Sequence, residues 1–575
     1  MHRRAIGEPG DRPPQDGVCF AVAAGVETSV LQSSVLPLPV AEVATWPTAD
    51  AAGRVFSIAS ARVVALTLAV VIAFAFRTTA LSTYGFSEDE INKVHAIEQY
   101  RAGHFGANAE HPMLMKLAMW GSVAAADGWN KVAPPDQQMS LETAIRLPNA
   151  VAGAATTLAL FGVAQLLFGS AAAFAAAFFW AFDVNAIAIN RLGKEDTLLL
   201  FFFLVAVWFY ERAKRQGAFD PTGAQRWYAA SGASFGLMLA SKYMPHYLGI
   251  YALFNTLTDV NPGANRPNVR RYYGAMAAAF LAANFIVLAP ETWRYCIDYV
   301  QGGMLTHHGY AYAGQLYVTN IPISPLGVPA GYYLNFLATK VPLVVLAAAV
   351  PGFIEIVRRR RERGFVLLRV LLVFLLVPYS LMAAKFMRYT LPMLATLDLL
   401  AGVGLVAGIK WLLGKGWLSP VARVTVAVLA LAVSIVGLVS SPLSAAPYYS
   451  LFQNGIGARH VGPPVTFPEA TYDFGVREAV ADIVKAAAPS AIIVTDAPVV
   501  ASHYLEGSNR SDLRVRSLSA EGIPYGPHEV WVIAQDEHLT FENELVLEHL
   551  RQGTPWREFH AGRARAAQVF RIGGR

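Results

Sequence analysis

Three consecutive acidic residues, Glu88, Asp89 and Glu90, follow the first long apolar run of the chain. Carboxylates so close to an apolar span are unusual unless they are paired or wetted. A carboxylate at such a place can act as the general base that removes the proton of an incoming hydroxyl. The pattern also fits the start of a helix, with Ser87 as N-cap and the acids in the first turn. Both interpretations can hold, because a cap leaves at least one carboxylate free.

A second charged segment, 110-EHPMLMK-116, opens another apolar stretch. Its acid, imidazole and amine, Glu110, His111 and Lys116, are groups that can hold a phosphate or a divalent cation. The alternative is ordinary helix initiation, with Pro112 near the first turn.

A third segment, 190-NRLGKED-196, crowds charges into a turn between two apolar runs. It contains Arg191, Lys194, Glu195 and Asp196. If the turn lies outside the cell, the positive-inside rule does not account for these charges. Either they serve a site, or they are solvated loop charges.

Further candidates lie at other apolar ends. Lys242 and Arg388 each stand where an apolar run stops, and snorkelling is the alternative explanation for both. In 306-THHGYAYAGQ-315, His307 and His308 could bind a metal or donate to a phosphate, and Tyr310 could form part of a sugar or lipid platform. Surface decoration is the alternative for an isolated histidine pair.

Composition defines the elements that must position these residues. Of 575 residues, 55% are hydrophobic and 15% are charged, against about 25% charged in soluble domains. Several apolar runs reach the roughly 20 residues that a spanning helix needs. The one dense basic run, 358–363, directly follows an apolar run, so membrane topology explains it and no nucleic-acid site is indicated.

The apolar runs predict about eleven spans in a mainly α-helical, polytopic membrane protein. They are 61–80, 144–168, 170–189, 197–212, 227–242, 244–260, 272–290, 332–356, 365–384, 389–410 and 421–440. The positive-inside rule places the basic loops in the cytoplasm. The three motif segments then share the outer face with the 291–331 loop and everything after 441. Because 81 and 143 must share a side, 112–128 should lie in the outer interface without crossing.

These assignments predict three parts of the chain. They are a disordered cytoplasmic tail at 1–58, a transmembrane domain at 59–441 and an extracytoplasmic α/β domain at 442–575. In the last part, 491-AIIVTD-496 and 528-HEVWVIAQ-535 predict buried strands. Segments 476–488 and 539–551 predict helices.

Five local patterns match one known family. The matching residues are Asp89–Glu90 after the first span, His111–Pro112 with Lys116, Arg191 with Asp196, Tyr332 with Lys340 before a Pro, and Arg146 with Pro148. Over about residues 60 to 460 the chain resembles the lipid-carrier-dependent glycosyltransferases of the GT-C type (glycosyltransferase family 39). Within them it is similar to protein O-mannosyltransferases and lipid A aminoarabinose transferases. It departs from them at Met113, where the family usually has a second Pro.

The resemblance implies an enzyme of the plasma membrane with its active site outside. It would transfer a sugar from a polyprenyl-phosphate donor, with inversion, to a hydroxyl of a protein or an envelope lipid or glycan. The implied catalytic carboxylates are Asp89 and Glu90. The implied phosphate-binding cations are Lys116, Arg191, Lys242 and Arg388. The remaining site residues would be Glu110, His111, Asp196, His307, His308 and Tyr310, with Glu110 and His307 as ligands if a divalent metal ion takes part.

Two other classes of protein are open at this point. A transporter would use polar groups at mid-membrane, for which Asp398 is the main candidate. A scaffold protein would show no tight cluster of outer acids and cations.

Overall fold

The computed structural model describes residues 49–259, 266–301, 309–318, 326–460, 467 and 470–573. The chain forms two compact units, Met1–Ala59 and Ser60–Arg575. The candidate site and the sheets belong to the second unit. The predicted disordered tail at 1–58 lies mostly outside the described residues, and the first helix begins at Ala49.

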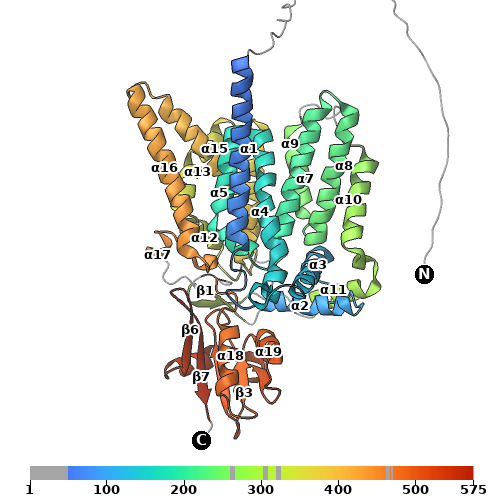
Figure 1. The fold of residues 1–575 in the computed structure, drawn as a ribbon, viewed down its shortest axis with the longest axis vertical. Helices are drawn as coiled ribbons and strands as arrows, with labels where there is room; N and C mark the ends of the chain where they lie inside the picture. Colours follow the sequence, from blue (N-terminus) through green and yellow to red (C-terminus); the bar gives the residue numbers. More distant parts are fainter. Residues whose placement is uncertain are drawn as a thin grey trace, which may run out of the picture. The chain divides into compact units, whose positions relative to one another are not determined.

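Long helices that run side by side form most of the second unit (Figure 1). Their apolar faces pack on one another in a core rich in alanine and aromatic side chains. They are α1 (Ala49–Thr78), α4 (Leu141–Phe168), α5 (Ser170–Phe182), α7 (Asp196–Gly217), α8 (Pro221–Ser241), α9 (His246–Thr258), α10 (Val269–Ala283), α13 (Leu343–Arg358), α14 (Arg363–Leu381), α15 (Leu391–Leu413) and α16 (Pro420–Ala445).

Each predicted span coincides with a helix or a helix pair in the described part of the chain. Five helices are long and apolar enough to cross a membrane by themselves, and up to seven spans result if each of two bent pairs is one span. The remaining predicted spans, 197–212, 227–242, 244–260 and 272–290, correspond to α7 to α10, which are shorter or less apolar than that criterion requires.

Two predicted spans are broken rather than continuous. The span at 170–189 bends by 61° between α5 and α6 (Val184–Asn190), where the Asp183 carboxylate accepts the N–H groups of Asn185 and Ala186 and starts a new helix. The span at 332–356 bends by 116° between α12 (Tyr332–Lys340) and α13, which begins after Pro342. A hydropathy profile does not detect either break, because it averages over a window that includes the residue at which the new helix starts.

Three helices lie at one end of the bundle, next to the C-terminal sheet. They are α2 (Glu88–Arg101), α3 (Met113–Asn130) and α11 (Pro290–Gln301) (Figure 1). Helix α3 is not among the candidate spans, in agreement with the prediction that 112–128 does not cross. Ser87 is the N-cap of α2, and its three acids fill the first turn as the sequence indicated.

The C-terminal part is a small α/β fold, as predicted. Its sheet has the order β4-β3-β5-β7-β6, in which β3 pairs in parallel with β4 and β5, while β7 pairs antiparallel with β5 and β6. Strands β3 and β5 are buried along their whole length, as expected for strands covered on both faces. The elements are α18 (Val476–Ala486), β3 (Ile492–Thr495), α19 (Pro498–Glu506), β4 (Arg514–Ser517), α20 (Leu518–Glu521), β5 (Val530–Ala534), α21 (Glu544–Arg551), β6 (Arg557–Ala561) and β7 (Ala564–Ile572).

Short elements connect these parts. They are η1 (Pro135–Gln137), η2 (Phe285–Leu288), β1 (Tyr310–Tyr312), β2 (Gln315–Tyr317), η3 (Met387–Thr390), η4 (Tyr449–Leu451) and α17 (Gly457–His460).

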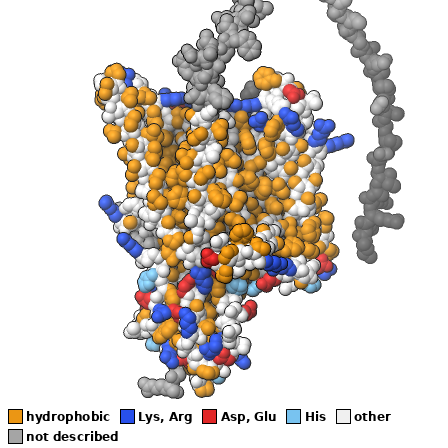
Figure 2. Space-filling view, viewed as in Figure 1, with side chains coloured by type: hydrophobic (Ala, Val, Ile, Leu, Met, Phe, Trp, Pro, Cys, Tyr) orange, Lys and Arg blue, Asp and Glu red, His pale blue; other side chains and the backbone are white. Residues whose placement is uncertain are grey.

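The surface confirms a membrane protein. Hydrophobic side chains cover the outside of the long helices, and Lys and Arg gather at the end away from the sheet (Figure 2). On α16, Val424, Val433 and Val436 are more than half exposed, which suits contact with lipid. The C-terminal sheet and its helices instead carry acids and bases intermixed (Figure 2).

Candidate functional site

Glu90 anchors the start of α2. It forms a two-point ion pair with Arg146 of α4, with Nε–Oε1 and Nη2–Oε2 distances of 2.8 Å, and both side chains are fully buried. Its carboxylate also accepts the N–H of Gly193 at 2.9 Å and the N–H of Ser87 at 3.0 Å. Burial disfavours the charged form, but Arg146 and these donors together hold the pKa of Glu90 below its ordinary value. Glu90 therefore joins α2, α4 and the 190–196 turn.

Asp89, the neighbour of Glu90, points toward two cations. Its carboxylate forms an ion pair with Lys194 of the same turn, and its Oδ2 lies 3.9 Å from Nη1 of Arg388 in η3. The side chain of Asp89 is 41% exposed, while those of Lys194 and Arg388 are 3% and 14% exposed. Asp89 is thus the acid of this cluster that an incoming molecule can reach.

The cluster continues inward as alternating charges. Glu195 pairs with Lys93 of α2 at 2.9 Å and lies 3.9 Å from Nδ1 of His111. Asp196, the first residue of α7, pairs with Lys242 after α8 at 2.7 Å. All of these except His111 are nearly or fully buried. Five segments distant in sequence thus converge, which the scaffold alternative did not predict.

The charge of Lys194 depends on these neighbours. Burial, together with the like charge of Arg388, lowers the pKa of Lys194 well below its ordinary value. Glu195 and Asp196 act in the opposite direction. Burial and Arg388 thus disfavour the charged form of Lys194, while the two buried acids favour it.

A polar cavity of about 390 Å³ opens beside Asp89. Its volume falls in the range of small-molecule sites. Helix α2 forms one wall, and the 107–111 loop with Tyr295 of α11 forms the other. The polar lining residues are Asp89, Asn92, Lys93, His95, Gln99, Asn108, Glu110, His111 and Tyr295. Burial lowers the pKa of His111 to about 4, so its imidazole is neutral near pH 7.

Two of the predicted phosphate-binding cations have other partners. Lys116 is buried and donates to the carbonyls of Asn108 and His111, so it shapes the cavity wall, and burial lowers its pKa to about 7. Arg191 is buried and donates to carbonyls at the end of α1, with distances of 3.1 Å to Phe76 and 2.8 Å to Ala80. Cations at a helix C-terminus satisfy its last carbonyls. Of the four, Lys242 and Arg388 belong to the charge cluster.

The C-terminal part holds α2 through a contact that no sequence pattern predicted. Oδ2 of Asp473 accepts the N–H of Glu88 at 3.0 Å, and Oδ1 lies 2.5 Å from Nε2 of His538. We call Asp473 and His538 the α2 clamp. Tyr472 and Asp473 have φ values of 43° and 60°, a conformation that residues other than glycine seldom adopt.

The α2 clamp is an ion pair outside the membrane-spanning helices. Burial alone would disfavour the imidazolium, but the Asp473 carboxylate raises the pKa of His538 to about 9. Burial likewise disfavours the carboxylate, yet His538 and the hydrogen bonds hold the pKa of Asp473 below its ordinary value. Nearby, burial raises the pKa of Glu537 to about 7.

Three other predicted residues either lie apart from the charge cluster or fall outside the residues that the structure describes. His307 and His308 are outside the described residues, so the predicted metal pair with Glu110 stays a prediction. Within the described ranges no three His, Cys, Asp or Glu side chains are grouped to hold a metal ion. Tyr310 is buried in β1 against Phe386, which is next to η3.

Two further residues singled out from the sequence, Lys340 and Asp398, lie within the helical bundle. Lys340 donates to the carbonyl of Ser450 at 2.6 Å, where the chain turns from α12 to α13. Asp398 is buried in α15, and its Oδ2 has no hydrogen-bond partner within the described part of the chain.

The fold is the GT-C fold that the resemblance predicted. The crystal structure of ArnT from Cupriavidus metallidurans bound to undecaprenyl phosphate matches with a TM-score of 0.50 at 13% identity. The match covers 88% of this chain and 97% of that one. Residues 138–290 match the family model described as "Dolichyl-phosphate-mannose-protein mannosyltransferase".

A curated relative is similar in sequence over a shorter stretch. It is the "Putative mannosyltransferase YkcB" of Bacillus subtilis (strain 168), 31% identical over 107 residues. The matched stretch is 19% of this chain and spans 15% of the length of that relative.

Proposed function

We propose that the chain is a glycosyltransferase that moves a sugar from a polyprenyl phosphate to a hydroxyl acceptor, with inversion at the anomeric carbon. The observation that carries the proposal is Asp89, a half-exposed carboxylate between Lys194 and Arg388 at the edge of a polar cavity. The similarity to the fold of ArnT, which was crystallised with undecaprenyl phosphate, supports the choice of donor.

In the proposed reaction, Asp89 acts as the general base. The acceptor hydroxyl enters the cavity and gives its proton to the Asp89 carboxylate while its oxygen forms a bond to the anomeric carbon. The bond from that carbon to the phosphate oxygen breaks, and the electron pair leaves with the phosphate. A positioned general base contributes about 10² to 10⁴ in rate.

The cations stabilise the leaving phosphate. Its negative charge grows in the transition state, so a positive group aimed at it binds that state more tightly than the ground state. We assign this role to Arg388 and Lys194. Lys242, which is paired with Asp196, lies deeper in the same cluster. Lys116 and Arg191 instead support the cavity wall and the end of α1.

Glu90 acts as a positioning residue in this scheme. Its carboxylate accepts hydrogen bonds from Arg146, from two backbone N–H groups and from the hydroxyl of Ser87, and it is fully buried. The two carboxylates predicted as a catalytic pair thus divide into a base and its support.

The acceptor would come from the side of the membrane that carries the C-terminal sheet. The basic loops lie at the other end of the helices, and by the positive-inside rule this supports an extracytoplasmic position for the sheet side. The proposed acceptor is a protein or an envelope lipid or glycan, and the proposed location is the plasma membrane.

The test is sugar transfer from radiolabelled polyprenyl-phosphate sugars to envelope fractions, with and without a chelator. Asp89→Asn should lower transfer by at least about 10²-fold, because the base is lost. Asp127→Asn is the matched control, since Asp127 is an exposed acid on α3 paired with Arg101. Transfer by Asp89→Asn within a few-fold of the control would refute the assignment, provided both variants unfold at the wild-type temperature.

A further inference from the structure

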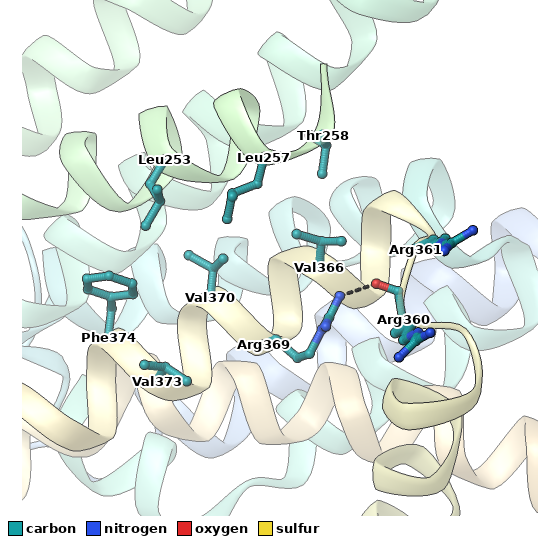
Figure 3. Close-up of a pocket in the computed structure, with 10 residues that line it drawn as sticks. All are labelled: Leu253, Leu257, Thr258, Arg360, Arg361, Val366, Arg369, Val370, Val373 and Phe374. Carbon is teal, nitrogen blue, oxygen red and sulfur yellow. Dashed lines mark hydrogen bonds between the residues drawn. The ribbon is translucent and has the colours of Figure 1, made fainter. Parts of the chain in front are cut away.

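A groove of about 560 Å³ lies between α9 and α14, at the end of the bundle that carries the basic loops. Arg360 and Arg361 stand at its rim, in the turn before α14, and Arg369 lies one to two turns into that helix (Figure 3). Arg369 donates to the carbonyl of Arg360, which holds the rim against the helix.

The rest of the groove is apolar and follows the helices. Val366, Val370, Val373 and Phe374 recur at the spacing of one face of α14. Leu253 and Leu257 of α9 face them across the groove (Figure 3). Leu257, Val373 and Phe374 are 60%, 53% and 38% exposed, so the apolar strip is open to the hydrocarbon around the bundle.

The arginines of the basic turn divide into two groups. Arg358, Arg359 and Arg363 pair with Glu355, Glu362 and Glu211 at 3.5, 2.5 and 2.7 Å, respectively. Within the described ranges, Arg360, Arg361 and Arg369 have no carboxylate within 4 Å. The positive-inside rule explains a basic loop. It does not explain why the arginines without an acidic partner are those that line the groove.

We propose that this groove binds an anionic glycerophospholipid of the surrounding membrane. The three arginines would take the headgroup phosphate, for which guanidinium groups provide charge-assisted donors. An acyl chain would lie on the apolar strip of α9 and α14. Basic pockets between spanning helices are sites where anionic lipid headgroups bind.

The groove is separate from the proposed catalytic site. It lies at the N-terminal end of α14, while Arg388 follows the C-terminal end of the same helix. At 1.5 Å per residue, the 19 residues of α14 separate the two by about 28 Å. A lipid in the groove is therefore not the sugar donor at Asp89, and the proposal stands or falls independently of the proposed reaction.

The test is lipid retention by the full chain, purified in mild detergent and measured by native mass spectrometry after addition of phosphatidylglycerol or phosphatidylcholine. The wild type should retain phosphatidylglycerol at least about tenfold better, since each 1.4 kcal/mol of charge-assisted binding is a factor of ten. The triple variant Arg360→Gln, Arg361→Gln and Arg369→Gln should lose that preference. Inorganic phosphate should not displace the lipid, because the apolar strip also holds it.

The control variant is Arg358→Gln with Arg359→Gln, which removes two charges from the same turn but from residues paired with acids. It should keep the preference within about twofold. If the triple variant fails to fold, Arg360→Gln with Arg361→Gln decides, because both side chains are exposed and neither donates a described hydrogen bond. Equal loss in groove and control variants, or equal retention of both lipids by the wild type, would overturn the proposal.

Discussion

Asp89 and Glu90 are adjacent in the chain and yet have opposite environments. Glu90 is fully buried in a two-point ion pair with Arg146, whereas Asp89 is half exposed between Lys194 and Arg388. The sequence predicted that acids and cations would meet here. It could not divide the roles, because the partners are decided by contacts between residues far apart in the chain.

Glu90→Ala should destabilise the protein strongly. It leaves the Arg146 guanidinium buried without its counter-charge, and breaking a buried pair in this way costs about 3–5 kcal/mol. Asp127→Ala breaks only an exposed pair, worth about 0–1 kcal/mol. Thermal unfolding in detergent measures the difference. A Glu90→Ala variant that unfolds at the temperature of the control would show that the ion pair is not what anchors α2.

Asp196→Asn should reduce sugar transfer without touching the proposed base. The Asp196 carboxylate pairs with Lys242 and helps to keep Lys194 charged although burial lowers the pKa of Lys194. Transfer should therefore fall at all pH values and most at high pH, where Lys194 of the variant loses its proton first. A pH–rate profile identical to that of the wild type would contradict this coupling.

At the scale of the elements, α2 is the helix that its neighbouring elements hold in place. It packs on α3 and α19 in an apolar core that α18 shares, and its first turn is held by the α2 clamp. Binary patterning predicted α18, β3, β5 and α21, since each has a clear period or apolar run. The α2 clamp stayed hidden because Asp473 lies in an irregular segment, where neither helix nor strand periodicity marks a residue.

The α2 clamp predicts a pH window for stability. The pKa of His538 is raised to about 9, so its contribution is fully present below about 6.5 and is lost as pH rises through 9. The pKa of Asp473 is lowered, so its contribution is present above about 3.9 and is lost as pH falls below that value. Amide exchange at the first turn of α2 should speed up between pH 8 and 10 beyond its intrinsic pH dependence.

His538→Gln should remove that pH dependence, and exchange at α2 should be fast throughout. His560→Gln is the matched control, because His560 is a half-exposed histidine 4.0 Å from Glu558 in the same sheet. An increase of the same size in both variants would mean that the α2 clamp does not order α2.

At the scale of the whole molecule, charge and hydrophobicity are arranged in layers. Basic loops lie at one end of the long helices and the acid-bearing α2, with the C-terminal sheet, at the other (Figure 2). Span positions followed from hydropathy together with the positive-inside rule, which was needed to exclude 112–128. The breaks at Asp183 and Pro342 did not, since each depends on one residue that starts a new helix.

Accessibility labelling tests the orientation of these layers. With Cys19 and Cys296 replaced by serine, Asp127→Cys and Asn509→Cys should react with an impermeant maleimide in intact cells. Arg358→Cys should react only after permeabilisation, since the positive-inside rule places its loop in the cytoplasm. Labelling of Asp127→Cys and Asn509→Cys from opposite faces would contradict both the orientation and the shared site.

Helix α2 is held in place at Glu90 and by Asp473, and this limits how the cavity can change when a substrate enters. One wall of the cavity beside Asp89 is fixed, because α2 is hydrogen-bonded to α4, to the 190–196 turn and to Asp473 of the C-terminal part. The opposing wall is formed by the 107–111 loop and by Tyr295 of α11, where Thr292 and Trp293 donate to the carbonyls of Ile286 and Val287 in η2. Because α2 is held at three places, we expect the Asp89 carboxylate to keep its position while a substrate enters the cavity.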